Sequence, residues 1–411
     1  MNIKNLLFLF IGIIPILIFS CSTENELIEE NVNKISQNKT SSSSNTITIE
    51  NAKRIAAQII NFNTRGEEDP EVEFIKYNNI SIRHKLLSDT LAYVIQYKDR
   101  EGFAIIANDN RIDPILAYSN NSNIDIHNEL IKSIFINKIE LYLASISDSG
   151  NNISNYKKRI IIEPQIADYV QIGPTSPLDK VVISHYPNCH AGFVNVATAT
   201  VISHFFPDLV YKGYHYNFEN IYTTFTYSIH NPLDPIKPTE KPSTIFNRPI
   251  PPKEFQNTYQ GSVTAISQFL YDIGVSSNSY YDNNYAPDTP ISGVVEAMKE
   301  LGLEVTEINN YKENTLNDIY NLLNDGYLLE LLGRHKNNDG SFVDIPLLQN
   351  NFGLVIDGCD VYVDSNGSAY NGYLHCILGM FELGRGFFSY PVLAAGQENY
   401  FDPELFIGIK N

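Results

Sequence analysis

The sequence predicts an α+β protein that folds as two domains. About 390 residues follow an apolar N-terminal segment, which is enough chain for two sizeable cores. In residues 46–148, predicted helices lie on either side of β-rich runs, and in residues 164–411 four predicted helices come before four predicted strands. Helices and strands that are grouped along the chain, rather than alternating, are typical of the α+β class.

The first domain, residues 46–148, is predicted to begin with a helix that Thr48 caps. The apolar residues of this helix form one stripe: Ala52, Ile55, Ala56, Ile59 and Ile60. Two β-rich runs follow, Leu91–Tyr97 and Gly102–Ala107, and a second amphipathic helix is predicted from about Glu129 to Ile146. Together these elements predict a small α+β module.

Residues 149–163 are predicted to be a linker, in which Lys157-Lys158-Arg159 is an exposed target for a trypsin-like enzyme. The second domain, residues 164–411, is predicted to contain helices at 193–206, 262–273, 291–301 and 315–325, then strands near 327–332, 352–359, 373–380 and 386–390. The proline-rich residues 231–252 predict a surface loop. The D-S-N-G sequence within Asp360–Gly372 predicts a turn between two strands rather than a calcium loop.

The N-terminus predicts a secreted lipoprotein. Met1–Ser20 has a basic start at Lys4 and a continuous apolar run, as signal peptides do. Ile18-Phe19-Ser20-Cys21 resembles a bacterial lipobox, so Cys21 is the expected lipidation site and residues 21–45 the flexible tether. A transmembrane anchor is the alternative, but the run is short for a span of about 30 Å. The expected location is the bacterial outer membrane or cell surface, as in the Bacteroides group.

Composition excludes several classes of partner. The net charge of −18 argues against binding to nucleic acid or to anionic lipid head groups. No G-x-S-x-G, H-E-x-x-H or phosphate-binding glycine loop occurs, so neither a cofactor nor a metal is expected. Nothing in the sequence indicates an oligomer, and a monomer is expected.

Residues 190–207 contain the most informative pattern, H-A-G-F-V-N-V-A-T-A-T-V-I-S-H-F-F-P. Its apolar residues recur at helical steps and Pro207 ends the run. This stretch resembles the nucleophile helix of the streptopain-like cysteine peptidases. Residues 102–119, 268–286, 352–360 and 374–388 resemble other segments of that family, in the same order. The resemblance implies a papain-like fold preceded by an inhibitory propeptide, here residues 46–148.

The resemblance also locates the catalytic positions, and each carries an apolar residue here. Phe193 stands at the nucleophilic cysteine, and Phe352 at the general-base histidine. Ile377-Leu378 replaces the Asn-Trp pair that orients the histidine, and Pro174 replaces the oxyanion-binding glutamine. Phenyl rings cannot ionise or form a thioester. We therefore expect a pseudo-peptidase, which binds a peptide or protein or regulates active relatives.

A different class of function stays open at this point, an active cysteine endopeptidase with relocated residues. Cys189 lies four residues before Phe193, and His190 is next to it. Sequence neighbours rarely have the geometry of a nucleophile and its base. His375 matches a non-catalytic family position, and we expect it to be a hydrogen-bonded core histidine. The resemblance also places Cys359 and Cys376 on adjacent strands, where a disulfide could form.

Overall fold

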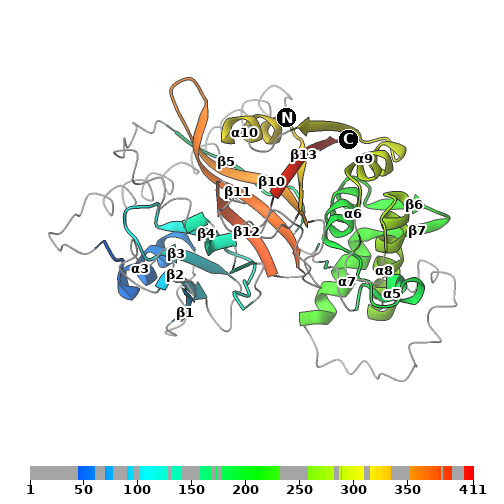
Figure 1. The fold of residues 1–411 in the computed structure, drawn as a ribbon, viewed down its shortest axis with the longest axis horizontal. Helices are drawn as coiled ribbons and strands as arrows, with labels where there is room; N and C mark the ends of the chain where they lie inside the picture. The colour runs from blue at the N-terminus through cyan, green and yellow to red at the C-terminus, as the bar shows by residue number, and fades with distance from the viewer. Residues whose placement is uncertain are drawn as a thin grey trace, which may run out of the picture. The chain divides into compact units, whose positions relative to one another are not determined.

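The computed structural model describes residues 45–60, 70–76, 90–96, 102–127, 131–132, 134–136, 138–139, 158–167, 170, 172–173, 177–230, 258–281, 287, 289–309, 315–334, 352–380, 383–390 and 402–411 (Figure 1). The predicted signal segment, Cys21, Pro174 and the proline-rich residues 231–252 lie outside these ranges. None of the described helices is long and apolar enough to cross a membrane. The predicted α+β class is confirmed.

The N-terminal part packs helix α3, Ile49–Ile59, on four antiparallel strands. The strands are β1, Glu71–Lys76; β2, Thr90–Gln96; β3, Phe103–Ala107; and β4, Ile115–Ser119. Thr48 caps α3 as predicted, because its hydroxyl accepts a hydrogen bond from the Asn51 N–H at 3.3 Å. The predicted helix near residue 131 has buried apolar side chains at Ile131, Ile134 and Ile139.

The remaining strands extend the same sheet. They are β5, Lys158–Ile162; β8, Glu304–Asn309; β9, Leu328–Arg334; β10, Phe352–Val363; β11, Ala369–Met380; β12, Leu383–Ser389; and β13, Asp402–Lys410. The order is β1-β2-β3-β4-β12-β11-β10-β9-β13-β8, and β5 pairs with β10. All of these pairings are antiparallel. The N-terminal strands and the C-terminal strands therefore share one sheet through β4 and β12.

The helices of the second part lie between β5 and β9 in the chain. They are α5, Lys180–His185; α6, Phe193–Phe205; α7, Phe218–His230; α8, Tyr259–Ser276; α9, Ile291–Glu300; and α10, Leu316–Asn324. A hairpin of β6, Asp208–Tyr211, and β7, Tyr214–Asn217, separates α6 from α7. The four predicted helices and four predicted strands of this part are all present, each within a few residues of its expected bounds. Helix α6 is buried on nearly every side, against α8 and against β9, β10 and β11 (Figure 1).

The predicted linker differs from the structure at its C-terminal end. Residues 158–162 form β5, which pairs with the second half of β10, so that Ile160 is opposite Val361. Lys158 is exposed as expected, but the Arg159 side chain is only 22% exposed and forms an ion pair with Asp360. The polar residues before Ile160 indicate a linker when only the neighbouring sequence is considered. Its pairing partner lies about 200 residues away, and only the folded chain supplies it.

Two smaller expectations concern β10 and β11. The turn between them is built by Asp364, whose carboxylate accepts hydrogen bonds from the backbone N–H groups of Asn366 and Ser368. No group of three metal-ligating side chains occurs among the described residues.

The three described cysteines, Cys189, Cys359 and Cys376, are all buried and form no disulfide. Cys359 is opposite Leu374 and Cys376 opposite Ile356, so the two are not cross-strand partners.

Candidate functional site

The start of helix α6 places the first candidate residue, Phe193. Gly192 precedes the helix with φ of +85°, a left-handed conformation that favours glycine. A Cβ atom on Gly192 would lie 2.6 Å from the Pro287 ring, so both the conformation and the packing require glycine there. Phe193 is half-buried and packs against the apolar core that includes Leu354 and Leu378.

Strand β10 brings the second candidate position to the same place. Phe352 is the first residue of β10, and its side chain lies outside the described part. The next residue, Gly353, lies against the first turn of α6: a Cβ atom there would be 2.9 Å from Val194 Cα and 3.1 Å from the Phe193 carbonyl oxygen. Backbone approach this close requires glycine. Positions 193 and 352 are therefore neighbours, although 159 residues separate them in the chain.

The end of strand β11 completes the junction. Ile377 is 6% exposed and Leu378 is fully buried. Gly379, with φ of +66°, lies against α6, since a Cβ atom there would be 3.0 Å from a methyl carbon of Val196. Helix α6 thus lies against the start of β10 at Gly353 and against the end of β11 at Gly379, and Phe193 and Leu378 share one apolar core. The Ile377 side chain belongs to the other apolar core of this part. Pro174 is the one candidate of this set whose position lies outside the described residues.

These positions offer no group that can exchange a proton or attack a carbonyl. A thiol peptidase needs a nucleophile, a base and an orienting group at hydrogen-bonding distance from one another. Phenylalanine, isoleucine and leucine side chains supply none of these. The described side chains at the start of α6 make apolar packing contacts.

The alternative nucleophile, Cys189, lies one turn before the helix and is fully buried. The ring of its neighbour His190 is used elsewhere: its Nδ1 is 2.6 Å from a carboxylate oxygen of Asp179. Asp179 is itself 1% exposed, and His190 has 23% of its side chain exposed. The sequence did not indicate this His–Asp pair. It holds the loop before α6 and directs the imidazole toward a carboxylate.

His375 is a hydrogen-bonded core histidine, as expected. Its Nδ1 lies 2.5 Å from a carboxylate oxygen of Asp357, and the two side chains are 3% and 0% exposed. The other Asp357 oxygen accepts the Ile166 N–H at 2.9 Å. Burial alone would raise the pKa of Asp357, but His375, Arg385 and the Ile166 N–H outweigh it and lower that pKa. The pair joins β10 to β11 within the core, since Asp357 lies on the first strand and His375 on the second.

One buried acid was missed at the sequence level. Glu330 lies on β9, is fully buried and faces helix α6, where Thr198 Oγ1 donates to its Oε1 at 3.0 Å. Its Oε2 has no partner among the described residues. Burial raises the pKa of Glu330 to about 8, although the Thr198 hydrogen bond opposes the rise. A lone glutamate inside the apolar run Leu328–Leu332 was the available signal.

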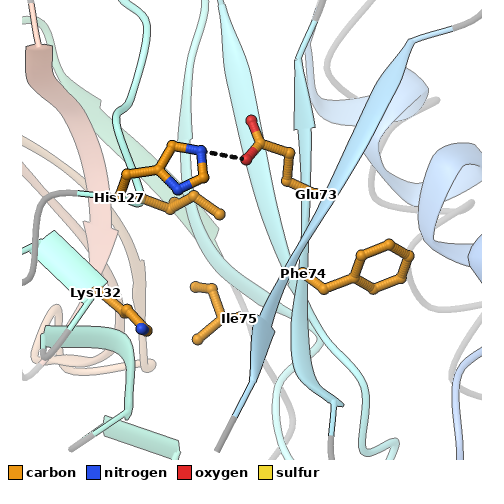
Figure 2. A pocket seen from close by; sticks show the side chains of 6 residues that line it. Glu73, Phe74, Ile75, His127 and Lys132 are labelled. Atoms are coloured by element: carbon orange, nitrogen blue, oxygen red, sulfur yellow. Dashed lines mark ion pairs between the residues drawn. The ribbon is translucent and has the colours of Figure 1, made fainter.

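A small cavity lies elsewhere, beside strand β1 (Figure 2). Its volume is about 150 Å³, and Figure 2 shows Glu73 pointing toward His127 while Phe74 points to the opposite face of the strand. His127 Nε2 is 3.1 Å from a Glu73 oxygen, with 83% of the histidine side chain exposed. Exposed pairs of this kind contribute little to stability. The cavity has no relation to the candidate positions on α6, β10 and β11.

Comparison with known proteins identifies the N-terminal part. Residues 44–137 match the family model described as Spi protease inhibitor. Among curated proteins there is no match. Among solved structures the chain is similar to a fragment of prointerpain A from Prevotella intermedia, with 15% sequence identity and a TM-score of 0.48, over 83% of this chain and 98% of that one. Residues 44–137 are thus similar to the Spi protease inhibitor family, in agreement with the inhibitory propeptide that the sequence predicted for residues 46–148.

Proposed function

We propose that this chain is a pseudo-peptidase: a lipid-anchored member of the streptopain-like family that binds a peptide or protein and does not cleave it. An active relative of the same family is one candidate partner. The observation that carries the proposal is the apolar character of these positions: Phe193 packs against the core that includes Leu378, and Ile377, opposite Val355 on β10, is buried in the neighbouring core.

The energetics of the junction support the same conclusion. An unpaired buried polar group costs about 1–3 kcal/mol, so an isolated histidine or cysteine kept here would destabilise the fold. A fully buried leucine or isoleucine instead stabilises it by about 1.5–3 kcal/mol. Leu378 also packs closely against Gly384 on β12, where a Cβ atom would be 2.9 Å from its Cδ1. The residues at the former catalytic positions thus suit a packed core.

Purified full-length protein is expected to show no turnover of casein or of fluorogenic peptides. A broad thiol-reactive cysteine-peptidase probe should leave Cys189 unlabelled in the native state, because that thiol is fully buried. The same probe should label Cys189 once the protein is denatured. Casein turnover in the wild type that disappears in Cys189→Ala, together with native labelling of Cys189, would establish the relocated-peptidase alternative instead.

The double variant Phe193→Cys/Phe352→His is the control for the alignment of the positions. It restores a nucleophile and a base but leaves Ile377 and Leu378, which cannot orient an imidazole, so it should also be inactive. Substantial peptidase activity in the double variant would mean that these two residues do not occupy the orienting positions. A pull-down with immobilised peptide libraries, compared between wild type and this variant, then reports binding separately from cleavage.

Lipid attachment at Cys21 is the second part of the proposal, and its support is the signal-like segment with a lipobox-type ending at that cysteine. Cells grown with a labelled fatty acid should incorporate the label into the wild-type protein. Cys21→Ala should lose the label and leave the membrane fraction, because two or more acyl chains are what make anchoring stable. Label that persists in Cys21→Ala would remove this part of the proposal.

A further inference from the structure

One buried carboxylate, that of Asp360 on β10, joins three separate segments of the chain. Arg159 on β5 donates to both of its oxygens, from Nε to Oδ1 at 2.7 Å and from Nη2 to Oδ2 at 2.5 Å. The hydroxyl of Tyr118 donates to Oδ2 at 2.8 Å. Tyr118 lies on β4, within residues 44–137, which are called the inhibitor-type domain below. Arg159, like Asp360, follows residues 140–157 in the chain, and Tyr118 precedes them.

The burial of the group makes these partners necessary. The Asp360 side chain is 3% exposed, and Tyr118 is 7% exposed. A buried carboxylate is costly unless it is paired and hydrogen-bonded, and the two-point contact with Arg159 is the strong form of such pairing. Burial, followed by the nearby Asp360 charge, raises the pKa of Tyr118 well above its ordinary value, so the phenol stays a donor.

The surroundings of Tyr118 form the contact between the two parts of the sheet. Tyr118 is opposite Phe387 in the β4–β12 pairing, and their rings stack at 5.1 Å with 13° between the planes. Tyr373 on β11 meets the Tyr118 ring edge-on at 5.6 Å. Gly386 lies against the Tyr118 backbone, since a Cβ atom there would be 2.6 Å from the Tyr118 carbonyl oxygen. Both edges of β4 are therefore paired, one with β3 and one with β12.

We propose that Asp360, with Arg159 and Tyr118, is a latch that holds the inhibitor-type domain to the rest of the chain without a covalent connection. Cleavage between residues 140 and 157 leaves β5 on the C-terminal fragment, where Arg159 continues to orient Asp360 toward Tyr118. While the latch is closed, β4 has no edge available for another protein. The latch does not depend on whether the chain is a pseudo-peptidase.

The test uses the full chain with a site-specific protease sequence inserted between residues 140 and 157. After cutting, the two wild-type fragments should elute together in size-exclusion chromatography. Asp360→Asn and Tyr118→Phe should each speed separation of the fragments, measured by dilution, by about ten- to a hundredfold, because each weakens a charge-assisted hydrogen bond. Tyr118→Phe keeps the ring stack and so isolates the hydroxyl.

Tyr93→Phe is the matched control. Tyr93 is also a buried tyrosine of the inhibitor-type domain, but its hydroxyl contacts the Ile47 carbonyl and Asn108 within that domain, each at 2.8 Å. It should lower the stability of that domain and leave the separation rate of the fragments unchanged. Wild-type fragments that separate as fast as those of Asp360→Asn, or equal rates in Tyr93→Phe and Tyr118→Phe, would overturn the latch.

Discussion

Replacing His375 with leucine is expected to lower the free energy of unfolding by about 3–5 kcal/mol. The substitution removes the partner 2.5 Å from the Asp357 carboxylate and leaves that buried group with the Ile166 N–H and the neighbouring Arg385. A buried charge that loses its partner is costly because water cannot replace the lost interaction. Urea denaturation of the full chain, followed by far-ultraviolet circular dichroism, measures the change.

His127→Leu is the control for that experiment, because His127 pairs with Glu73 at 3.1 Å but 83% of its side chain is exposed. Its effect should stay within about 1 kcal/mol. The stability of the protein should also fall in acid because of Asp357. Its lowered carboxyl pKa contributes stability at pH values above the ordinary value of 3.8, and this stability is lost as the pH falls through the folded-state pKa. A loss below about 1 kcal/mol in His375→Leu would contradict the assignment of this pair as structural.

Replacing Glu330 with glutamine is expected to stabilise the protein at neutral and alkaline pH. The folded-state pKa of Glu330 is raised to about 8 from an ordinary value of 4.5. Between these values the folded chain binds the proton more tightly than the unfolded chain, so the free energy of unfolding falls as the pH rises through this window. At pH 7 the loss is about 3 kcal/mol, from 1.36 kcal/mol for each pH unit above 4.5.

Glutamine keeps the acceptor for Thr198 Oγ1 and carries no charge, so the stability difference between variant and wild type should grow from pH 4.5 to pH 8 and then level off. Thermal or urea unfolding across that pH range measures it. Glu296→Gln is the control, since Glu296 lies exposed on helix α9 and should show no such trend. A flat difference for Glu330→Gln would mean that water or another group satisfies the buried carboxyl.

Local patterns were sufficient for some of the regular elements, but β5 was predicted as part of a linker, and α5, α7, β1, β8 and β13 were not predicted. Helix α6 was predicted from apolar spacing between Val194 and Phe205 and from Pro207, and it spans Phe193–Phe205. The Thr48 cap and the β10–β11 turn also depend on residues within a few positions of one another. Such interactions can be predicted because the partners are fixed by short stretches of backbone. The apolar character of residues 193, 352, 377 and 378 also follows from the sequence alone.

Contacts between distant segments could not be predicted in this way. Glu330 and Thr198 are 132 residues apart, Asp360 and Arg159 201 apart, and Asp360 and Tyr118 242 apart. Nothing in the local sequence marks Arg159 as a buried ion-pair partner rather than an exposed linker residue. The roles assigned to Cys21, Pro174, Phe193, Phe352, Ile377 and Leu378 stay predictions.

The sequence by itself determined the class of fold and an N-terminal part similar to the Spi protease inhibitor family, because these depend on residue identity and short-range periodicity. Only the tertiary structure decided which polar groups are buried together and that the inhibitor-type strands continue into the C-terminal sheet. The physical reason is that burial and pairing depend on which segments meet in space, and the β4–β12 and β5–β10 pairings bring together segments separated by more than 190 residues.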